Sequence, residues 1–202
     1  MHLPIGDRRV IFVGTGKFLG VSDKADASEQ TVYAISDDTV SSVAVTDRSP
    51  LVQQVIVNDT STTRTVTAPA AVDWSNPAVR GWYVDLPDKG ERVSVDLQLQ
   101  LGSLVVPSNV PSNDTCVAGG TGWINVFDFK TGSFVAGATA NAVSQKVTGS
   151  VVVGINVIQL PGGKVVTVVT TADNQQRAVE TPIAPTTFQG KRIGWRELNA
   201  DQ

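Results

Sequence analysis

Short strand-like segments constrain the fold of this chain more than any other feature. Each is rich in β-branched or aromatic residues, often alternates with polar residues, and is bounded by Gly, Pro, Asn or Asp. The segments are RRVIFVG (8–14), QTVYAIS (30–36), LVQQVIVN (51–58), TRTVTA (63–68), VSVDLQLQ (93–100), GSLVVPS (102–108), GWINVFD (122–128), NVIQLP (156–161) and KVVTVVTT (164–171). No long window shows the apolar spacing of a helix. We therefore expect an all-β fold with little helix.

Two units recur along the chain. The first is an aromatic strand that ends at an acidic turn, as in TVYAISDD (31–38), GWYVDLPDKGERV (81–93) and GWINVFDFKTGSFV (122–135). The turn glycines Gly90 and Gly132 are separated by roughly the 40 to 50 residues that form one four-stranded propeller blade. This spacing favours a β-propeller.

The second unit is an apolar strand that runs into a polar loop, at residues 10–30, 101–122 and 163–176. In the first two cases the loop leads to an aromatic strand, at Tyr33 and Trp123, as expected for neighbouring antiparallel strands of one blade. At roughly 40 to 55 residues per blade, residues 1–202 are predicted to form one partial propeller domain of about four antiparallel blades.

The stretch VIFVGTGKFLG (10–20) places glycines and a lysine directly after a strand, as a phosphate-binding loop does. However, Ile11 stands where such a loop needs its first glycine, and Phe18 stands where it needs Ser or Thr. The dinucleotide fingerprint fails at Leu19. We interpret the glycines as a bend where a strand leaves its sheet, and we expect Phe18 and Leu19 to cover the edge of the core.

The charge pattern argues against two classes of partner. The formal net charge is −3 and no run of Lys or Arg stands out, so we expect no binding to nucleic acid. No apolar stretch approaches the roughly 18 to 20 residues of a membrane span, and the first residues contain no apolar signal-peptide region. We expect either a cytosolic protein or an internal piece of a longer exported one.

Two residue types are almost absent, which limits the possible chemistry. Cys116 is the only cysteine, so an internal disulfide or a multi-cysteine metal site is excluded; we expect it to be buried or paired outside this segment. The only histidine, His2, lies at a terminus that we expect to be mobile. Catalytic triads and imidazole bases therefore lack their central residue.

Acidic residues gather at the turns. In DFKTG, Asp128 is predicted to accept hydrogen bonds from backbone N–H groups, and Gly132 to take the left-handed position that closes the hairpin. A second acidic group consists of Asp85, Asp88, Glu91 and Asp96. Two carboxylates can make a glycosidase, but we interpret this group as a polar turn and the solvent face of a strand. No catalytic, cofactor-binding or metal-binding residue is predicted.

The aromatic residues admit two interpretations. Trp82 and Trp123 each follow a glycine at the start of a repeated strand, so we expect them to pack between blades rather than to stack on a sugar. Trp74 is expected to be exposed. Glycosylation triplets begin at Asn58 and Asn113, and we expect a bacterial protein to leave them unmodified.

Four blocks in order resemble one protein family. They lie at Val10 to Ile35, Gly81 to Val93, Asn113 to Gly132 and Gly190 to Leu198, and cover a little under half the chain. Together the chain resembles the C-terminal part of the PilC/PilY family of type IV pilus tip adhesins. In that family the region belongs to a β-propeller, and a Trp-Arg-Glu motif like Trp195 to Glu197 ends the protein.

The resemblance implies a function that composition does not. It implies a non-enzymatic module of a large exported protein at the pilus tip or outer membrane of a Gram-negative bacterium. Its partners would be minor pilins and a host or abiotic surface, and it would promote pilus assembly and oppose retraction. The chain would be the second half of a larger propeller, so its open faces would contact the remaining blades or drive self-association.

One family property does not carry over. Family members bind calcium in a loop of alternating aspartates followed by glycine. That one-three-five spacing is absent at Asp23 and Asp26, at Asp37 and Asp38, and at Asp85 and Asp88. We therefore expect no calcium site in this segment. The alternative is an enzyme, a quinone-dependent dehydrogenase-like propeller, whose blades also end in turns with an Asp-x-x-Thr-Gly pattern.

Overall fold

The structure is a computed structural model that describes residues 2–5, 8–37, 45–112, 119–161 and 163–181. The described chain is all-β: it forms three sheets of five, six and three strands, and its only helices are the short 3₁₀ turns η1 (Val21–Ala25) and η2 (Thr139–Asn141). Strand pairs are antiparallel except β4 with β7, which run parallel. The predicted all-β class and low helix content are confirmed.

The chain enters the first, middle and last sheets in that order, but it returns once from the middle sheet to the first, because β5 and β6 precede β7 in sequence. The first sheet has the order β1 (His2–Ile5), β2 (Arg8–Gly14), β3 (Thr31–Asp37), β7 (Gly81–Asp85) and β4 (Leu51–Gln54). The middle sheet has the order β5 (Ile56–Asn58), β6 (Thr63–Val66), β11 (Ala142–Val147), β10 (Gly120–Asp128), β9 (Ser103–Pro111) and β8 (Gln98–Gln100). The last sheet contains β12 (Val152–Gln159), β13 (Val165–Thr171) and β14 (Gln176–Glu180).

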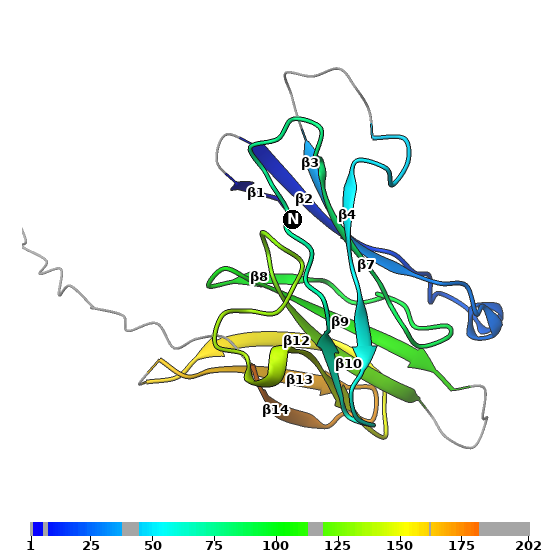
Figure 1. Cartoon of the computed structure of the whole chain (residues 1–202). Coiled ribbons are helices and arrows are strands. Elements are labelled where there is room, and N and C mark those ends of the chain that lie inside the picture. The colour runs from blue at the N-terminus through cyan, green and yellow to red at the C-terminus, as the bar shows by residue number, and fades with distance from the viewer. Residues whose placement is uncertain (1, 6–7, 38–44, 113–118, 162, 182–202) are drawn as a thin grey trace, which may run out of the picture.

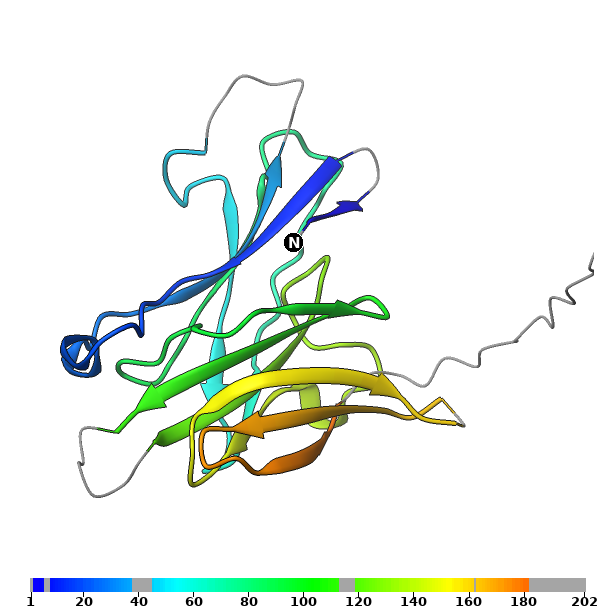
Figure 2. The ribbon, with the colours of Figure 1, turned by 180° about the vertical axis from the view of Figure 1, so that it is seen from behind.

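The three sheets are stacked, with the middle sheet between the other two (Figures 1 and 2). Side chains on a strand alternate between its two faces, so a sheet covered on both faces needs apolar residues at successive positions. Strand β9 shows this pattern: Leu104 and Val106 face the first sheet, whereas Val105 faces the last. The near-continuous burial of this strand therefore follows from its place in the stack.

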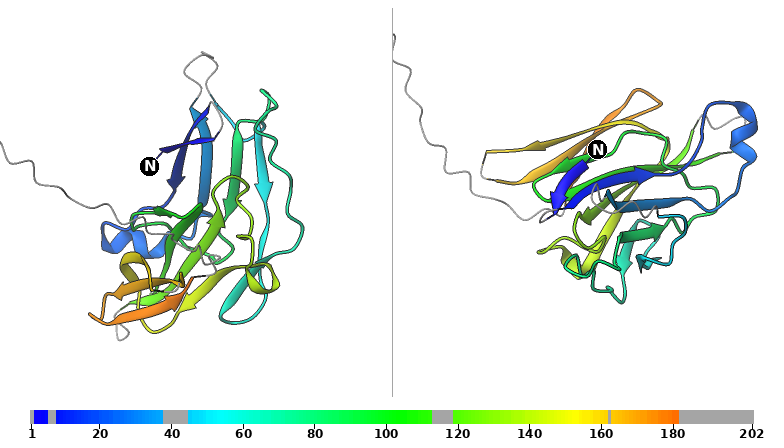
Figure 3. Two further views of the ribbon diagram at one scale, coloured as in Figure 1. Left: turned by 90° about the vertical axis from the view of Figure 1, so that its left-hand side faces the viewer. Right: turned by 90° about the horizontal axis from the view of Figure 1, so that it is seen from above.

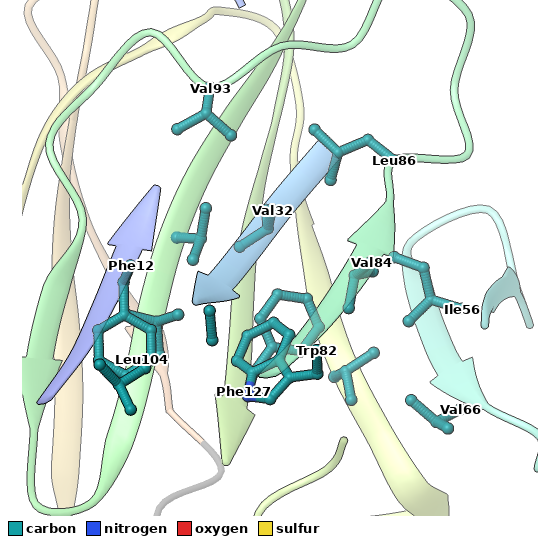
Figure 4. Close-up of a cluster of buried hydrophobic side chains, with 14 of the residues drawn as sticks. Phe12, Val32, Ile56, Val66, Trp82, Val84, Leu86, Val93, Leu104 and Phe127 are labelled. Atoms are coloured by element: carbon teal, nitrogen blue, oxygen red, sulfur yellow. The ribbon is translucent and has the colours of Figure 1, made fainter. Parts of the chain in front are cut away.

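The core between the first and middle sheets is large and aromatic. The buried Trp82 of β7 lies between Phe12 and Phe127, with ring centroids 6.4 and 6.1 Å away (Figure 4). Gly132 allows this approach: a Cβ on it would lie 2.4 Å from the indole of Trp82, and its φ of 70° suits glycine. The two sheets therefore meet in a close fit that leaves no room for a methyl group.

The core between the middle and last sheets is aliphatic. It is formed by Val105, Ile124, Val126, Val135, Val147, Val152, Val157, Val165 and Val169. Gly122 of β10 lies directly against Val152, whose Cγ2 would be 2.6 Å from an added Cβ. The two views of Figure 3 show the last sheet covering the side of β9 and β10 away from the first sheet.

Most predicted strands are confirmed, with two informative departures. The segment 51–58 forms two strands, because the chain crosses at Val55 from the first sheet to the middle sheet. The segment 93–100 is a strand only at Gln98–Gln100, since β9 pairs with it only there; the isolated bridge of Arg92 with Asn109 lies just before the segment. Strands β1, β11 and β14 were not predicted, and β1 places His2 opposite Ile11 rather than in a mobile end.

The second predicted unit matches the topology. Strands β2 and β3, β9 and β10, and β13 and β14 are antiparallel neighbours joined by the predicted loops. The first unit matches less well, because Trp82 lies on the fourth strand of the run β1-β2-β3-β7, whereas Trp123 lies on the third strand of the run β8-β9-β10-β11. Their positions are therefore not equivalent, although both side chains are buried.

Candidate functional site: the polar seam between the first and middle sheets

A group of polar side chains is buried beside the aromatic core, and we call it the polar seam. It consists of Arg64, Asp88, Glu91, Ser108, Trp123 and Asn125. Its centre is Arg64 of β6, whose side chain is fully buried and whose guanidinium carbon lies 3.7 Å from the centroid of the Trp123 ring. A planar cation stacked on indole keeps its edges free for hydrogen bonds.

Glu91 holds Arg64 in a two-point contact. The Arg64 guanidinium donates to both Glu91 carboxylate oxygens, at 2.8 and 2.7 Å, and Glu91 is fully buried as well. Ser108 donates its hydroxyl to the same carboxylate. Such a bidentate pair fixes both side chains in one geometry. Because each charge depends on the other for compensation, neither can be lost without exposing the other to an apolar interior.

Asp88 and Asn58 complete the shell around Arg64. Asp88 lies 2.8 Å from one terminal nitrogen of Arg64 and accepts a 2.9 Å hydrogen bond from the indole N–H of Trp123. Asn58 accepts from Nε of Arg64 at 3.0 Å and donates to Asp88. The three guanidinium nitrogens are thus all bonded.

The local sequence explains why these acids meet the arginine. The turn Leu86 to Arg92 follows β7, and a hydrogen bond from the Glu91 N–H to the Asp88 carbonyl oxygen closes it. Gly90 takes a φ of 74°, which a β-branched residue would not adopt. Asp88 and Glu91 therefore project together, into the middle sheet, from a connection that belongs to the first.

Asn125 carries the polar seam further across the middle sheet. Its amide donates to Ser108 Oγ at 2.9 Å and to the Val106 carbonyl at 3.0 Å, and it accepts from Ser144 Oγ at 2.6 Å. The seam is a saturated network in which each carboxylate already binds charged or neutral donors. Its chemistry suits holding two sheets in register, and it offers no free carboxylate as a nucleophile or base.

Arg92 organises the loop of residues 15–30 that joins β2 to β3. Its side chain is buried, and it donates to the carbonyl oxygens of Lys17, Asp23 and Asp26, at 2.9 Å for Lys17 and 2.6 Å for Asp26. One guanidinium thus satisfies three backbone acceptors of a segment that has no buried side chain in its 3₁₀ turn.

Two aspartates of this loop bind its own backbone. The Asp23 carboxylate accepts from the N–H groups of Leu19 and Gly20, at 2.8 and 3.0 Å, and the Leu19 bond is the main cause that lowers the pKa of Asp23 below 3.8. Asp26 accepts from the Ser28 N–H, which lowers its pKa in the same way. Both residues, weighed above as calcium ligands, thus form turns.

Side-chain amides join the middle sheet to the last. Asn109, which is buried, accepts from the Val152 N–H at 2.7 Å and donates to the Val152 carbonyl at 2.8 Å. Gln98 donates to the Ile155 carbonyl at 2.7 Å and accepts from the Val157 N–H at 3.1 Å. Each amide donates and accepts as a peptide group does. Together they form hydrogen bonds with backbone N–H and carbonyl groups on the edge of β12 that no described strand pairs with.

A second charged group lies on the outer face of the first sheet. Arg48 stacks on Tyr33 and Tyr83, with its guanidinium carbon 5.3 and 4.8 Å from the two ring centroids. It donates to Asp85, to Thr31 Oγ1 and to the Tyr33 hydroxyl. Asp85 therefore lies apart from Asp88 and Glu91, on the opposite face of β7 from Trp82.

The structure separates the acidic group that the sequence places together. Asp88 and Glu91 join the polar seam, so Glu91 does not lie in a solvent-facing turn as expected; Asp85 binds Arg48. Asp96 is exposed beside the loop of residues 15–30. The turn prediction for Asp128 is confirmed: its carboxylate accepts from the N–H groups of Lys130 and Thr131, at 2.9 and 3.0 Å.

Two predictions about exposure are wrong. Leu19 does not cover the core but is 87% exposed, because Asp23 and Arg92 hold its loop away from the sheets. Trp74 is half-buried: it packs on the aromatic core and its indole donates to the Lys130 carbonyl. Several other predictions lie outside the described residues, namely those on Asp38, Asn113, Cys116 and Trp195 to Glu197.

Sequence reasoning missed the residues that join the sheets. Arg64, Gln98, Asn109 and Arg48 all act across elements that are distant in sequence. For Arg64 a signal exists, because in the alternation of the strand TRTV it shares the inward face with the buried Val66. Such a cation implies a buried acidic partner.

Comparison of the chain with protein-family models, with curated proteins and with solved structures gave no match. Within residues 2–181 as far as they are described, no group of three or more His, Cys, Asp or Glu side chains is placed to hold a metal ion. The same part of the chain contains no helix with the length and hydrophobicity to cross a membrane.

Proposed function

We propose that this chain is part of a β-propeller and serves as a non-enzymatic attachment and assembly module at the tip of type IV pili. It would act in the manner of the PilC/PilY family, on the cell surface of a Gram-negative bacterium. The observation that carries the proposal is the stacking of three sheets, with the middle sheet covered on both faces by its neighbours.

The strand order supports a propeller. The first sheet contains the antiparallel run β1-β2-β3-β7, and the middle sheet contains the run β11-β10-β9-β8. Each run has the four strands of a blade. The additional strand β4 extends the first sheet at its edge, and the pair β5-β6 extends the middle sheet at its edge. In the proposed architecture the three described strands of the last sheet belong to a further blade. The predicted number of about four blades stays a prediction.

Two of the blocks that resemble the family supply the contacts between these sheets. Gly81 to Val93 provides Trp82, Asp88, Glu91 and Arg92, and the described part of the third block provides Trp123, Phe127 and Gly132. The residues that resemble the family therefore include those that position one sheet on the next. This fits a family in which the shared feature is a propeller framework.

The outer faces of the stack favour a larger assembly. On the first sheet Ile11 and Val13 are 39% and 41% exposed, and on the last sheet Ile158 is 36% exposed. In the proposed architecture these faces contact the remaining blades of a longer chain. Large side chains on a flat sheet face are what a neighbouring sheet would cover.

The alternative is an enzyme, a quinone-dependent dehydrogenase-like propeller. The sequence DFKTG favours it, since its acidic turn resembles the blade ends of those enzymes. In this chain Asp128 binds the backbone of its own turn, and the buried carboxylates of the polar seam are engaged with Arg64. These carboxylates make structural contacts, which a non-enzymatic module needs and which a catalytic role would not explain. We therefore favour the adhesin over the enzyme.

Deletion of the gene from its native host tests the proposal. We expect fewer surface pili and weaker attachment, restored by the wild-type gene, and we expect the purified protein to bind purified minor pilins. Unchanged piliation and attachment would overturn the proposal. Titration with pyrroloquinoline quinone in the presence of calcium tests the alternative, because a new absorbance band together with dye reduction would favour the enzyme.

A further inference from the structure

Two aliphatic side chains project into solvent from the loop of residues 15–30. Leu19 is 87% exposed and Val21 is 84% exposed. The next most exposed large apolar side chain among the described residues, Val153, reaches 53%. Single exposed aliphatic residues are common on proteins, but two neighbours at this level form a small apolar knob.

The knob is held rigidly. Arg92 donates to the backbone on both sides of it, at Lys17 and Asp23, and the Asp23 carboxylate accepts from the Leu19 and Gly20 N–H groups. A surface loop fixed in this way loses little conformational entropy when it binds. The contacts that hold the loop therefore also prepare it for an interface.

A hollow lined by both apolar and polar side chains lies directly beside the knob. It has a volume of about 330 Å³, and Leu19 forms part of its rim. Its lining includes Phe18, Val93, Val95 and Leu97, together with Lys17 and Asp96. The volume exceeds that of a leucine side chain, and four apolar side chains contribute to the lining, so a projecting aliphatic side chain of another molecule can fill it.

We propose that this patch is a homodimer interface in which the Leu19 and Val21 knob of each copy enters the hollow of the other. A two-fold symmetric interface requires one patch to carry both the projection and the cavity that receives it. The charges follow the same rule. Lys17 is 67% exposed and makes a 3.5 Å ion pair with Asp23, whereas Asp96 is exposed with no ion pair among the described residues, so in the dimer the exposed Lys17 of one copy faces Asp96 of the second.

A lipid surface fits the knob less well. The loop carries Lys17 and Lys24 against Asp23, Asp26 and Glu29, which gives it no excess of positive charge for anionic headgroups. Its aromatic residue, Phe18, is half-buried beneath Arg92 and cannot serve as an interfacial anchor. A bilayer also has no feature that would fill the hollow.

Sedimentation velocity over a concentration series tests the proposal on the full chain. We expect a weak, concentration-dependent dimer, as suits an interface of small area. The variant L19S/V21S should weaken it about tenfold or more, because each copy loses two buried aliphatic side chains. The variant D96K should weaken it about two- to fivefold, because it places two positive charges opposite each other.

The matched control is I11S/V13S, which removes two exposed aliphatic residues from the outer face of the first sheet. This control should leave the dimer unchanged. The proposal is overturned by a protein that stays monomeric at every concentration, or by a dimer that I11S/V13S weakens and L19S/V21S does not. Binding of the protein to phosphatidylcholine vesicles that depends on Leu19 and Val21 would also overturn it.

Discussion

The two interfaces between the sheets contain different kinds of side chain. The first and middle sheets meet through Trp82, Phe12 and Phe127, with the Arg64 and Glu91 ion pair buried beside them. The middle and last sheets meet through valine and isoleucine, with Asn109 and Gln98 bonded to the backbone of β12. One interface thus contains charge and large rings, and the other contains small side chains and neutral amides.

The difference teaches how each interface fixes its register. A buried ion pair is satisfied in one arrangement only, since a shift of either sheet would leave a charge without compensation. Small aliphatic side chains tolerate many arrangements. At the second interface the amides of Asn109 and Gln98 fix the register that the aliphatic side chains leave open. Each amide forms hydrogen bonds with particular backbone groups of β12.

The largest expected effect comes from removing the acid of the ion pair. Glu91→Ala leaves the buried Arg64 with only Asp88, which is partly exposed, as an acidic partner. We expect the free energy of unfolding to fall by about 3 to 5 kcal/mol, measured by urea denaturation. The double variant Arg64→Met with Glu91→Leu should lose much less, because no buried charge is orphaned. An equal loss in both variants would refute the charge explanation.

The next effect concerns the close approach of Gly132 to Trp82. Gly132→Ala places a methyl group inside the indole and also strains a φ of 70°, so we expect a loss of about 2 to 4 kcal/mol in the free energy of unfolding. Gly149→Ala is the matched control, since its φ is 88° and nothing lies within 4 Å of the added atom. If the two variants lose the same amount, backbone strain alone accounts for the effect.

The fold was predictable from the sequence in its class and in part of its connectivity. Alternating β-branched segments identify β2, β3, β9, β10 and β13, because each contributes to a core by a local pattern. Strand β14, with its sequence QRAVE, has too few apolar residues to show that pattern. The parallel pairing of β4 with β7 depends on a crossing at Val55 that no local signal marks.

The candidate site was less predictable, for a physical reason. Gly90 makes the turn LPDKGERV predictable from the local sequence. The partner of Glu91, however, is Arg64, which lies 27 residues away in sequence. Hydrogen-bond partners in different sheets are determined by how the sheets stack. In a single sequence such partners do not occur at any fixed spacing. The same holds for Leu19, whose exposure results from Arg92 on a different connection.

A smaller effect tests the amide contacts at the aliphatic interface. Asn109→Ala leaves the N–H and carbonyl of Val152 without their buried partner, and we expect a loss of about 1 to 3 kcal/mol in the free energy of unfolding. Hydrogen exchange of the Val152 amide should accelerate more than that of amides in β3. Asn156→Ala is the control, because Asn156 is exposed on the same strand and should change stability little. Equal exchange across all sheets would contradict a local role.

The smallest expected effect lies in the loop that carries Leu19 and Val21. Hydrogen bonds from Leu19 and Gly20 lower the pKa of Asp23 below 3.8, so the ionised carboxylate stabilises the folded loop. Because the folded pKa is the lower one, this contribution is complete above the ordinary Asp value and is lost as pH falls through the folded pKa. Nuclear magnetic resonance should show the Leu19 and Gly20 amide protons shifting together with a midpoint below the ordinary Asp value, and Asp23→Asn should abolish the shift. A midpoint that is not lowered from the ordinary Asp value would mean that Asp23 does not fix the loop, and the rigid knob beside the hollow would lose its physical basis.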